Sequence, residues 1–248
     1  MTAIELVDVS VEFEGVQALA EVHLAVEPGE FVTVIGPSGS GKTTLLRTIG
    51  GLQEPTRGAV SIDGEDPESA QSEGRIGYVF QDHTLFPWQT AIENVRFLRE
   101  MAGKSPKPGR ARSILSEMGL DGFEDHYPEA LSGGMKQRVA IGRALHLGAD
   151  LLLMDEPFGE LDELTREEIG VEIRRLWRDH DRTIVFVTHS VPEAVLLGDR
   201  CLVVDGPPGR IVRQFDVDLP RPREESVLES AAFQSTVSDI RAELHRKA

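Results

Sequence analysis

Several features are scarce in this chain of 248 residues. It has one cysteine, Cys201, so no disulfide can form within the chain, and the apolar sequence around it (CLVV) predicts a buried thiol. The first 41 residues contain no lysine or arginine, which secretory and transit segments need, so we expect no export. Apolar runs such as 151–154 and 184–187 are four residues long, far short of the roughly 20 that span a bilayer. We therefore expect a folded protein of a reducing, cytosolic compartment, without a membrane span of its own.

Basic residues are also in the minority. Lysine and arginine number 26 against 42 aspartate and glutamate residues, which gives a net charge of −16. Because electrostatic binding of DNA or RNA needs clustered lysine and arginine, this balance excludes a nucleic-acid-binding surface over the whole molecule. Only a local basic groove stays compatible with it, and we expect no nucleic-acid partner.

The order of the apolar segments predicts an α/β fold. Residues 4–13 alternate between apolar and polar side chains, as in an antiparallel strand with one buried face. A glycine-rich turn and a predicted helix at 42–49 follow the apolar run 30–35. Helical stretches separate the further apolar runs, which lie at 76–80, 151–154, 184–187 and 202–204. This alternation predicts a mostly parallel core sheet with an antiparallel β sub-domain.

Two other regions lack this alternation. Between about 90 and 147 the strand signals disappear, and an inserted helical sub-domain is expected, with helices near 90–102, 109–118 and 133–147. Near the end of the chain, prolines flank a short strand candidate at 211–215, and a final helix is expected at about 224–246. We therefore assign residues 1–215 to one domain that contains the insertion, and 216–248 to a C-terminal segment with prolines and a helix.

Residues 36–44 (GPSGSGKTT) match the phosphate-binding pattern G-x-x-x-x-G-K-[ST]. Glycines let the backbone turn its N–H groups toward phosphate oxygens at the start of a helix, Lys42 adds a positive charge, and the Thr43 hydroxyl suits Mg²⁺. A glycine turn without a ligand is the alternative, which the flanking strand and helix disfavour. The residues expected to bind a nucleotide here are Gly36, Pro37, Ser38, Gly39, Ser40, Gly41, Lys42, Thr43 and Thr44.

A second motif ends the apolar run 151–154 in two carboxylates and a proline (DEP). Asp155 is predicted to hold Mg²⁺, directly or through water, because Mg²⁺ prefers one or two carboxylates together with phosphate oxygens and waters. Glu156 is the candidate for polarising the attacking water. Taken alone, this sequence is more typical of a loop with a helix cap, but after a phosphate-binding loop it favours the metal site.

A third motif, 131–138 (LSGGMKQR), begins a predicted helix. Ser132 is a candidate N-cap, and simple capping is one interpretation. Gly133 and Gly134 weaken the helix start by roughly 0.5–1 kcal/mol each relative to alanine, which a cap alone does not require. We favour an anion from outside the chain at this helix N-terminus.

Polar residues follow two more predicted strands, with Gln81 after 76–80 and His189 after 184–187. A histidine at a strand end is by itself more often structural or exposed. In a parallel sheet, however, ligands bind at the carboxyl ends of the strands, so Gly36, Gln81, Asp155 and His189 are expected to meet at one edge. No spacing of histidines indicates a further metal site, and Mg²⁺ is the metal we expect.

Together these motifs resemble the ATP-binding subunit of an ABC transporter, whose full set they follow in order over roughly residues 3–215. The resemblance implies a P-loop ABC-type ATPase that binds ATP and Mg²⁺ and hydrolyses ATP to ADP and phosphate. It further implies that Phe13 stacks on adenine, that Gln81 reaches Mg²⁺ and senses a transmembrane partner, and that His189 contacts the γ-phosphate. The catalytic residues expected are Glu156, His189, Gln81 and Lys42, and the metal ligands expected are Thr43, Gln81 and Asp155.

The resemblance also implies partners. Two copies would pair head to tail, so that Ser132, Gly133 and Gly134 of one copy close the ATP site of the other, with Asp162 at the dimer contact. A separate permease and, indirectly, an extracytoplasmic solute-binding protein would place the chain peripherally on the cytoplasmic face of the cell (inner) membrane. The segments 79–88 and 208–223 resemble the importer branch for nitrate, sulfonates or taurine, and nothing in the sequence names the solute.

Two positions depart from the family pattern. Glu160 stands where a small residue is usual and adds a charge beside Asp162, which would loosen a closed dimer. Phe13 stands where tyrosine is common and keeps the stacking face.

Some alternatives stay open at this point. Residues 81–88 (QDHTLFPW) predict a contact with a permease helix, and packing of Phe86 and Trp88 within the chain is the alternative. A soluble ABC ATPase of assembly or repair is another function, disfavoured because the chain has one cassette and no coiled-coil insertion. A nucleotide-binding regulator without turnover is motivated only by Glu160.

Overall fold

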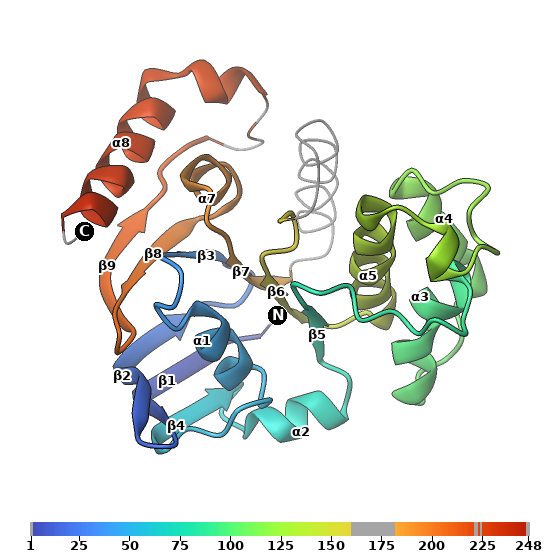
Figure 1. Ribbon diagram of the computed structural model, residues 1–248, viewed down its shortest axis with the longest axis horizontal. Helices are drawn as coiled ribbons and strands as arrows, with labels where there is room; N and C mark the ends of the chain where they lie inside the picture. Colours follow the sequence, from blue (N-terminus) through green and yellow to red (C-terminus); the bar gives the residue numbers. More distant parts are fainter. Residues whose placement is uncertain (1, 160–181, 221–222, 224, 247–248) are drawn as a thin grey trace.

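The computed structural model describes residues 2–159, 182–220, 223 and 225–246 (Figure 1). Within these residues strands and helices alternate along the chain and form two sheets and a group of helices. The thiol of Cys201 is fully buried, as expected from its apolar neighbours. No helix in the described ranges combines the length and apolar character needed to cross a membrane.

The larger sheet has six strands in the order β5-β6-β7-β3-β8-β9. All of its strands except β9 run parallel, and β9 pairs antiparallel with β8 at one edge. Its central strands are buried along their whole length and are mainly apolar, because both faces of the sheet are covered. The strands are β3 (Phe31–Ile35), β5 (Ile76–Val79), β6 (Leu151–Asp155), β7 (Thr183–Val187), β8 (Arg200–Asp205) and β9 (Arg210–Asp216).

The smaller sheet is antiparallel, in the order β2-β1-β4, with β1 (Ile4–Phe13), β2 (Val16–Val26) and β4 (Arg57–Ile62). Helix α1 (Lys42–Ile49) packs between the two sheets, and its leucines share a hydrophobic cluster with strands of both (Figure 1). The loop after β8 joins the sheets as well, because Ala20 N donates to Gly209 O at 3.0 Å and Gly209 N donates to Ala18 O at 2.9 Å.

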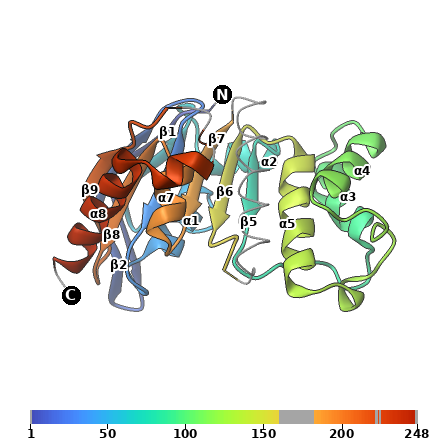
Figure 2. The same ribbon diagram turned by 90° about the horizontal axis from the view of Figure 1, so that it is seen from above.

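The helical region extends from the β5 edge of the larger sheet, and Figure 2 shows it as a lobe beside β5 and β6. Its helices are α3 (Ala91–Met101), α4 (Pro108–Glu117) and α5 (Gly133–Leu147), which confirms the three helices expected between about 90 and 147. Thr90 begins α3 with a capping box to Glu93. A hydrophobic cluster runs from these helices to one face of the sheet, so the lobe and the sheet share a core.

The predicted final helix at about 224–246 is wrong in its extent. A 3-10 turn occupies Glu225–Glu229, and α8 (Ala231–His245) begins only after Ser230. Ser230 interrupts the helix because its Oγ donates to Val227 O at 2.7 Å and accepts from Phe233 N at 3.2 Å, the geometry of an N-cap.

Other elements were not located from the sequence. These are the strands β2 and β4 and the short helices α2 (Pro67–Ser72) and α7 (Val191–Leu197). Helix α7 lies between β3 and α8, and α8 covers it and the end of β8 (Figures 1 and 2).

Candidate functional site

The glycine-rich loop 36–41 turns tightly between β3 and α1. A Cβ atom at Gly36 would lie 2.0 Å from Val204 O, so only glycine fits where the loop leaves β3 under the end of β8. Gly41 precedes α1 in a left-handed conformation with φ 86°. This geometry directs the loop over the start of α1, where free N–H groups and the helix dipole favour an anion.

A second loop, which follows β8, lies against the glycine-rich loop. A Cβ atom at Gly209 would lie 2.3 Å from Ser40 O, and Ser40 itself is fully buried. The two backbones therefore touch. Pro207 of the second loop and residues of the glycine-rich loop line one pocket.

Lys42 opens α1 and turns back over the loop. Its Nζ donates to Gly36 O and to Pro37 O, both at 2.9 Å, and the residue is 7% exposed. Burial lowers the pKa of the Lys42 ammonium, while the carboxylates of Glu156 and Asp155 act in the opposite direction. A buried cation so close to the loop suits a multiply charged anion.

Thr43 and Asp155 meet across the base of the site. The Thr43 hydroxyl lies 3.2 Å from Asp155 Oδ1, and Asp155 is 3% exposed at the end of β6. Burial raises the pKa of the Asp155 carboxyl, an effect that the hydrogen bond from Thr43 partly offsets. A hydroxyl, a carboxylate and the amide of nearby Gln81 are the hard oxygen donors that Mg²⁺ prefers, so these residues fit the ion.

Glu156 and His189 lie beside each other at the ends of β6 and β7. Because β6 and β7 are parallel and Asp155 is in register with Val187, Glu156 directly follows one strand, and His189 follows the other after Thr188 at the same edge. Glu156 N donates to Val187 O at 3.0 Å, and Glu156 adopts a left-handed φ of 45°. Its Oε2 is 3.5 Å from His189 Nδ1, and the histidine side chain is 60% exposed.

These elements surround one pocket of about 580 Å³, within the range of small-molecule sites. Most of its walls are residues that the sequence predicted, and they come from the ends of three strands and the loop after β5. The predicted residues in the lining are Gly36, Ser38, Gly39, Gly41, Lys42, Thr43, Thr44, Gln81, Glu156 and His189. The structure therefore brings Gly36, Gln81 and His189 to one edge of the sheet, as expected. Asp155, the fourth residue expected there, is not part of the lining, and it lies beneath it against Thr43, while Glu156 lines the pocket in its place.

Four lining residues were missed from the sequence: Val16, Gln17, Ala18 and Pro207. The first three begin β2, which the sequence did not locate. A signal for Pro207 was present in the run GPPG, but its approach to the pocket depends on the contact of Gly209 with Ser40.

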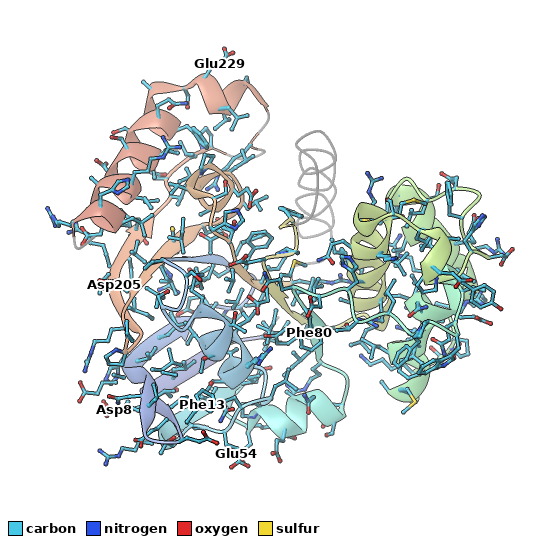
Figure 3. The ribbon with its side chains drawn as sticks, viewed as in Figure 1. Asp8, Phe13, Glu54, Phe80, Asp205 and Glu229 are labelled. Carbon is cyan, nitrogen blue, oxygen red and sulfur yellow. The ribbon has the colours of Figure 1, made fainter. Side chains whose placement is uncertain are left out.

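Some predicted site residues lie outside this lining. Phe13 is 45% exposed at the end of β1 in the small sheet, where it pairs with Val16 (Figure 3). Ser132, Gly133 and Gly134 begin α5 in the helical lobe, and the Ser132 hydroxyl accepts from Met135 N at 3.3 Å, which confirms it as an N-cap. Asp162 and Glu160 lie outside the described residues.

The loop after β5 is tied to α5. His83 Nδ1 lies 2.7 Å from Gln137 Oε1, and Arg143 donates both to Thr84 O and to Thr84 Oγ1 at 2.8 Å. Both α5 residues are buried. The segment that begins with Gln81 is therefore connected directly to the helix whose first turn carries the LSGG motif.

Comparison with known proteins places these features in context. The sequence profile described as ABC transporter matches residues 19–159. An uncharacterized ABC transporter ATP-binding protein of Methanocaldococcus jannaschii is 45% identical over 233 residues, 92% of this chain and 86% of that protein. The aliphatic sulfonates import ATP-binding protein SsuB of Bacillus cereus is 39% identical over 231 residues, 93% and 90% of the two chains.

A solved structure is also similar to this chain. It is a dimeric ATP-binding cassette in a post-hydrolysis state, bound to ADP and Pi. It shares 34% sequence identity at a TM-score of 0.78, and the match covers 88% of this chain and all of the other.

Proposed function

The chain belongs to the ABC transporter family, whose ATP-binding subunits hydrolyse ATP, and on that premise we propose that it drives an importer. In this proposal two copies close on ATP, closure moves a separate permease, and hydrolysis reopens the pair. The observation that carries its ATPase part is the pocket in which the phosphate loop, Gln81, Glu156 and His189 meet, and the importer part is supported by the similarity to SsuB proteins.

Nucleotide binding rests on the loop 36–44. The loop N–H groups and the Lys42 ammonium hold the phosphates, and Lys42 exchanges its bonds to the carbonyls of Gly36 and Pro37 for phosphate oxygens. The adenine end of the nucleotide lies toward the start of β2, where Phe13 offers a ring face beside Val16 and Gln17.

Thr43, Asp155 and Gln81 are the residues that would hold Mg²⁺. Bound there, the ion would offset the charge that develops on the phosphates. The described residues contain no group of three or more histidine, cysteine, aspartate and glutamate side chains able to hold a metal by themselves. Such a sparse protein set agrees with an ion that takes its other ligands from phosphate and water.

Hydrolysis rests on Glu156 and His189. The Glu156 carboxylate is placed to orient water and to accept its proton, and the neighbouring His189 offers a ring nitrogen to the γ-phosphate. Lys42 neutralises charge on the other side of the pocket. Catalysis of this kind depends mainly on positioning and on stabilisation of charge.

The LSGG motif completes the site in a second copy. Ser132, Gly133 and Gly134 do not line the pocket of their own chain, and the first turn of α5 offers N–H groups to an anion. A head-to-tail dimer supplies that anion as the γ-phosphate of the opposite nucleotide. The dimeric cassette with ADP and Pi supports the pairing of two copies.

The surface for the permease is the segment 81–88 with the adjoining face of α3. Trp88 is 70% exposed, although Phe86 packs against Phe97 with ring centroids 4.2 Å apart. An exposed tryptophan beside a half-buried aromatic pair is the composition expected of a contact site. In this position the chain lies peripherally on the cytoplasmic face of the membrane.

The solute is proposed to be a small compound of the nitrate, sulfonate or taurine class. The similarity to aliphatic sulfonates import proteins over nine-tenths of the chain supports this class. An extracytoplasmic binding protein would deliver the solute to the permease.

A cysteine crosslink to the permease tests the transport proposal. Trp88→Cys is compared with Met101→Cys, a matched control because Met101 is 71% exposed in the same lobe. The native Cys201 is buried, and burial raises the pKa of its thiol to about 11, so introduced thiols react alone. We expect position 88, and not position 101, to crosslink to a multi-span protein in native membranes, which mass spectrometry identifies.

The absence of a crosslink at both positions would contradict the importer proposal. If neither position crosslinks and a tagged chain purifies from membranes only with soluble proteins, the importer proposal fails. A soluble ABC ATPase then becomes the better account.

A further inference from the structure

Arg223, near the end of the chain, is buried against backbone carbonyl groups. The residue is 6% exposed. Its Nη1 donates to Val195 O at 3.0 Å, to Leu196 O at 3.3 Å and to Gly198 O at 2.6 Å, and its Nη2 donates to Val217 O at 2.9 Å. Burial of a guanidinium is unfavourable unless its donors are satisfied, so this arrangement is specific rather than incidental.

Three of these carbonyls form the C-terminal end of α7. The last carbonyls of a helix have no partner within the helix, and its C-terminus carries partial negative charge. Arg223 supplies both hydrogen bonds and a positive charge there, from 25 residues beyond Gly198. The arginine is thus a C-cap that the C-terminal segment provides for α7.

The opposite end of α7 begins at the pocket. His189 precedes Ser190, whose hydroxyl accepts from Glu193 N, and Thr188 Oγ1 donates to Glu193 Oε2 at 2.6 Å. A helix of seven residues is about 10 Å long. A displacement of α7 along its axis therefore moves the residue that faces the pocket.

Other contacts also hold α7, because Thr33 Oγ1 donates to Ala194 O at 3.2 Å and the helix packs through apolar side chains. Val191, Ala194 and Val195 share a hydrophobic cluster with Phe233 and Val237 of α8. Apolar contacts of this kind are non-directional, whereas hydrogen bonds from one planar guanidinium to successive carbonyls fix both the position and the rotation of a helix end.

We propose that Arg223 is a positioning residue for His189, acting through α7. The C-terminal segment thereby determines where the His189 ring lies beside Glu156. Arg223, the last residue of the sequence DLPRPR, thereby influences the ATP site. The inference rests on the role proposed above for His189.

The first test observes His189 directly. In protein labelled with ¹⁵N-histidine, the His189 ring signals are assigned from their loss in His189→Gln. We expect Arg223→Ala to shift these signals, and Arg223→Lys to shift them less because lysine keeps the charge but not the fork of donors. Val237→Ala, which removes apolar packing from the same cluster, is expected to lower the melting temperature without moving them. His189 signals unchanged in folded Arg223→Ala would overturn the proposal.

The second test measures ATP turnover. We expect Arg223→Ala to lower kcat about tenfold with KM within about twofold, because a small displacement of a catalytic group has this effect. In a His189→Ala background the same change is expected to have no further effect. Equal losses of kcat in both backgrounds would show that Arg223 acts independently of His189 and would overturn the proposal.

The two tests separate the inference from the function on which it rests. If His189→Ala hydrolyses ATP at the wild-type rate, the role proposed for His189 fails. The histidine spectrum alone then decides whether Arg223 holds the ring in place.

Discussion

Gly209→Ala is predicted to damage the nucleotide site from a loop outside the phosphate-binding motif. Gly209 does not have a left-handed φ, so an alanine there is not strained by its backbone conformation. The added Cβ would lie 2.3 Å from Ser40 O and 3.0 Å from Ala18 O. Real Cβ contacts shorter than about 3.0 Å essentially do not occur, so the two backbones must separate by at least 3.0 − 2.3 = 0.7 Å.

Backbone hydrogen bonds oppose a movement of the Gly209 loop away from Ser40. Gly209 is held by two backbone hydrogen bonds to β2, each worth about 1 kcal/mol. Either both bonds are lost or the Ser40 carbonyl moves inside the phosphate loop, which gives a cost of about 2 kcal/mol. For a chain of this size that energy lowers the melting temperature by about 4–8 °C. If the same energy opposes the nucleotide-bound conformation of the phosphate loop, it raises the nucleotide Kd by more than tenfold.

Circular dichroism melting and titration with a fluorescent ATP analogue measure the two effects. The matched control is Gly109→Ala, since nothing lies within 4 Å of a Cβ at that helical position. Alanine there is expected to be neutral or stabilising by about 0.5–1 kcal/mol. If Gly209→Ala keeps both the wild-type melting temperature and the wild-type Kd, the contact between the two loops does not support the nucleotide site.

Three further changes are predicted from the site and the core. Lys42→Ala should raise the ATP Kd by about 10- to 100-fold, because it removes a charge-assisted hydrogen bond, and wild-type affinity in a titration would refute that role. Glu156→Gln should bind ATP normally, lower turnover by about 100-fold or more and lengthen the lifetime of the ATP-bound dimer on gel filtration, whereas unchanged turnover would remove Glu156 from the mechanism. Burial and the nearby Arg99 and Arg96 lower the pKa of His146 from 6.5 to about 4. The folded state therefore binds this proton at a lower pH than the unfolded chain does. Stability should therefore fall by about 3 kcal/mol as the pH drops from 6.5 to 4, and melting curves of His146→Leu over this range should show a weaker pH dependence.

The core of the site could be predicted because it depends on local patterns and on one rule of topology. Gly36, Gln81, Asp155 and His189 each follow an apolar run, and parallel strands end at a common edge. The order of motifs along the chain was therefore enough to place these residues together. Lys42 and Thr43 then followed from the start of α1.

What escaped prediction depends on irregular strands and on contacts between distant segments. The register between β1 and β2 shifts at three places, which disturbs the alternation of side chains and hid Val16 and Gln17. The pair His83 and Gln137 is separated by 54 residues, and the approach of Gly209 to the phosphate loop joins the loops that follow two different strands, β3 and β8. Such contacts are fixed by packing of the whole fold, and no local pattern in the sequence reports them.

The backbone of Glu156 has a consequence for engineering. A left-handed φ of 45° is unfavourable by on the order of 1–2 kcal/mol for a residue with a side chain, and glycine would not bear that strain. Screening of variants for heat resistance alone would therefore favour Glu156→Gly and discard the carboxylate. A directed-evolution campaign on this chain has to score turnover and thermal tolerance in the same round, because at this position the two objectives select opposite residues.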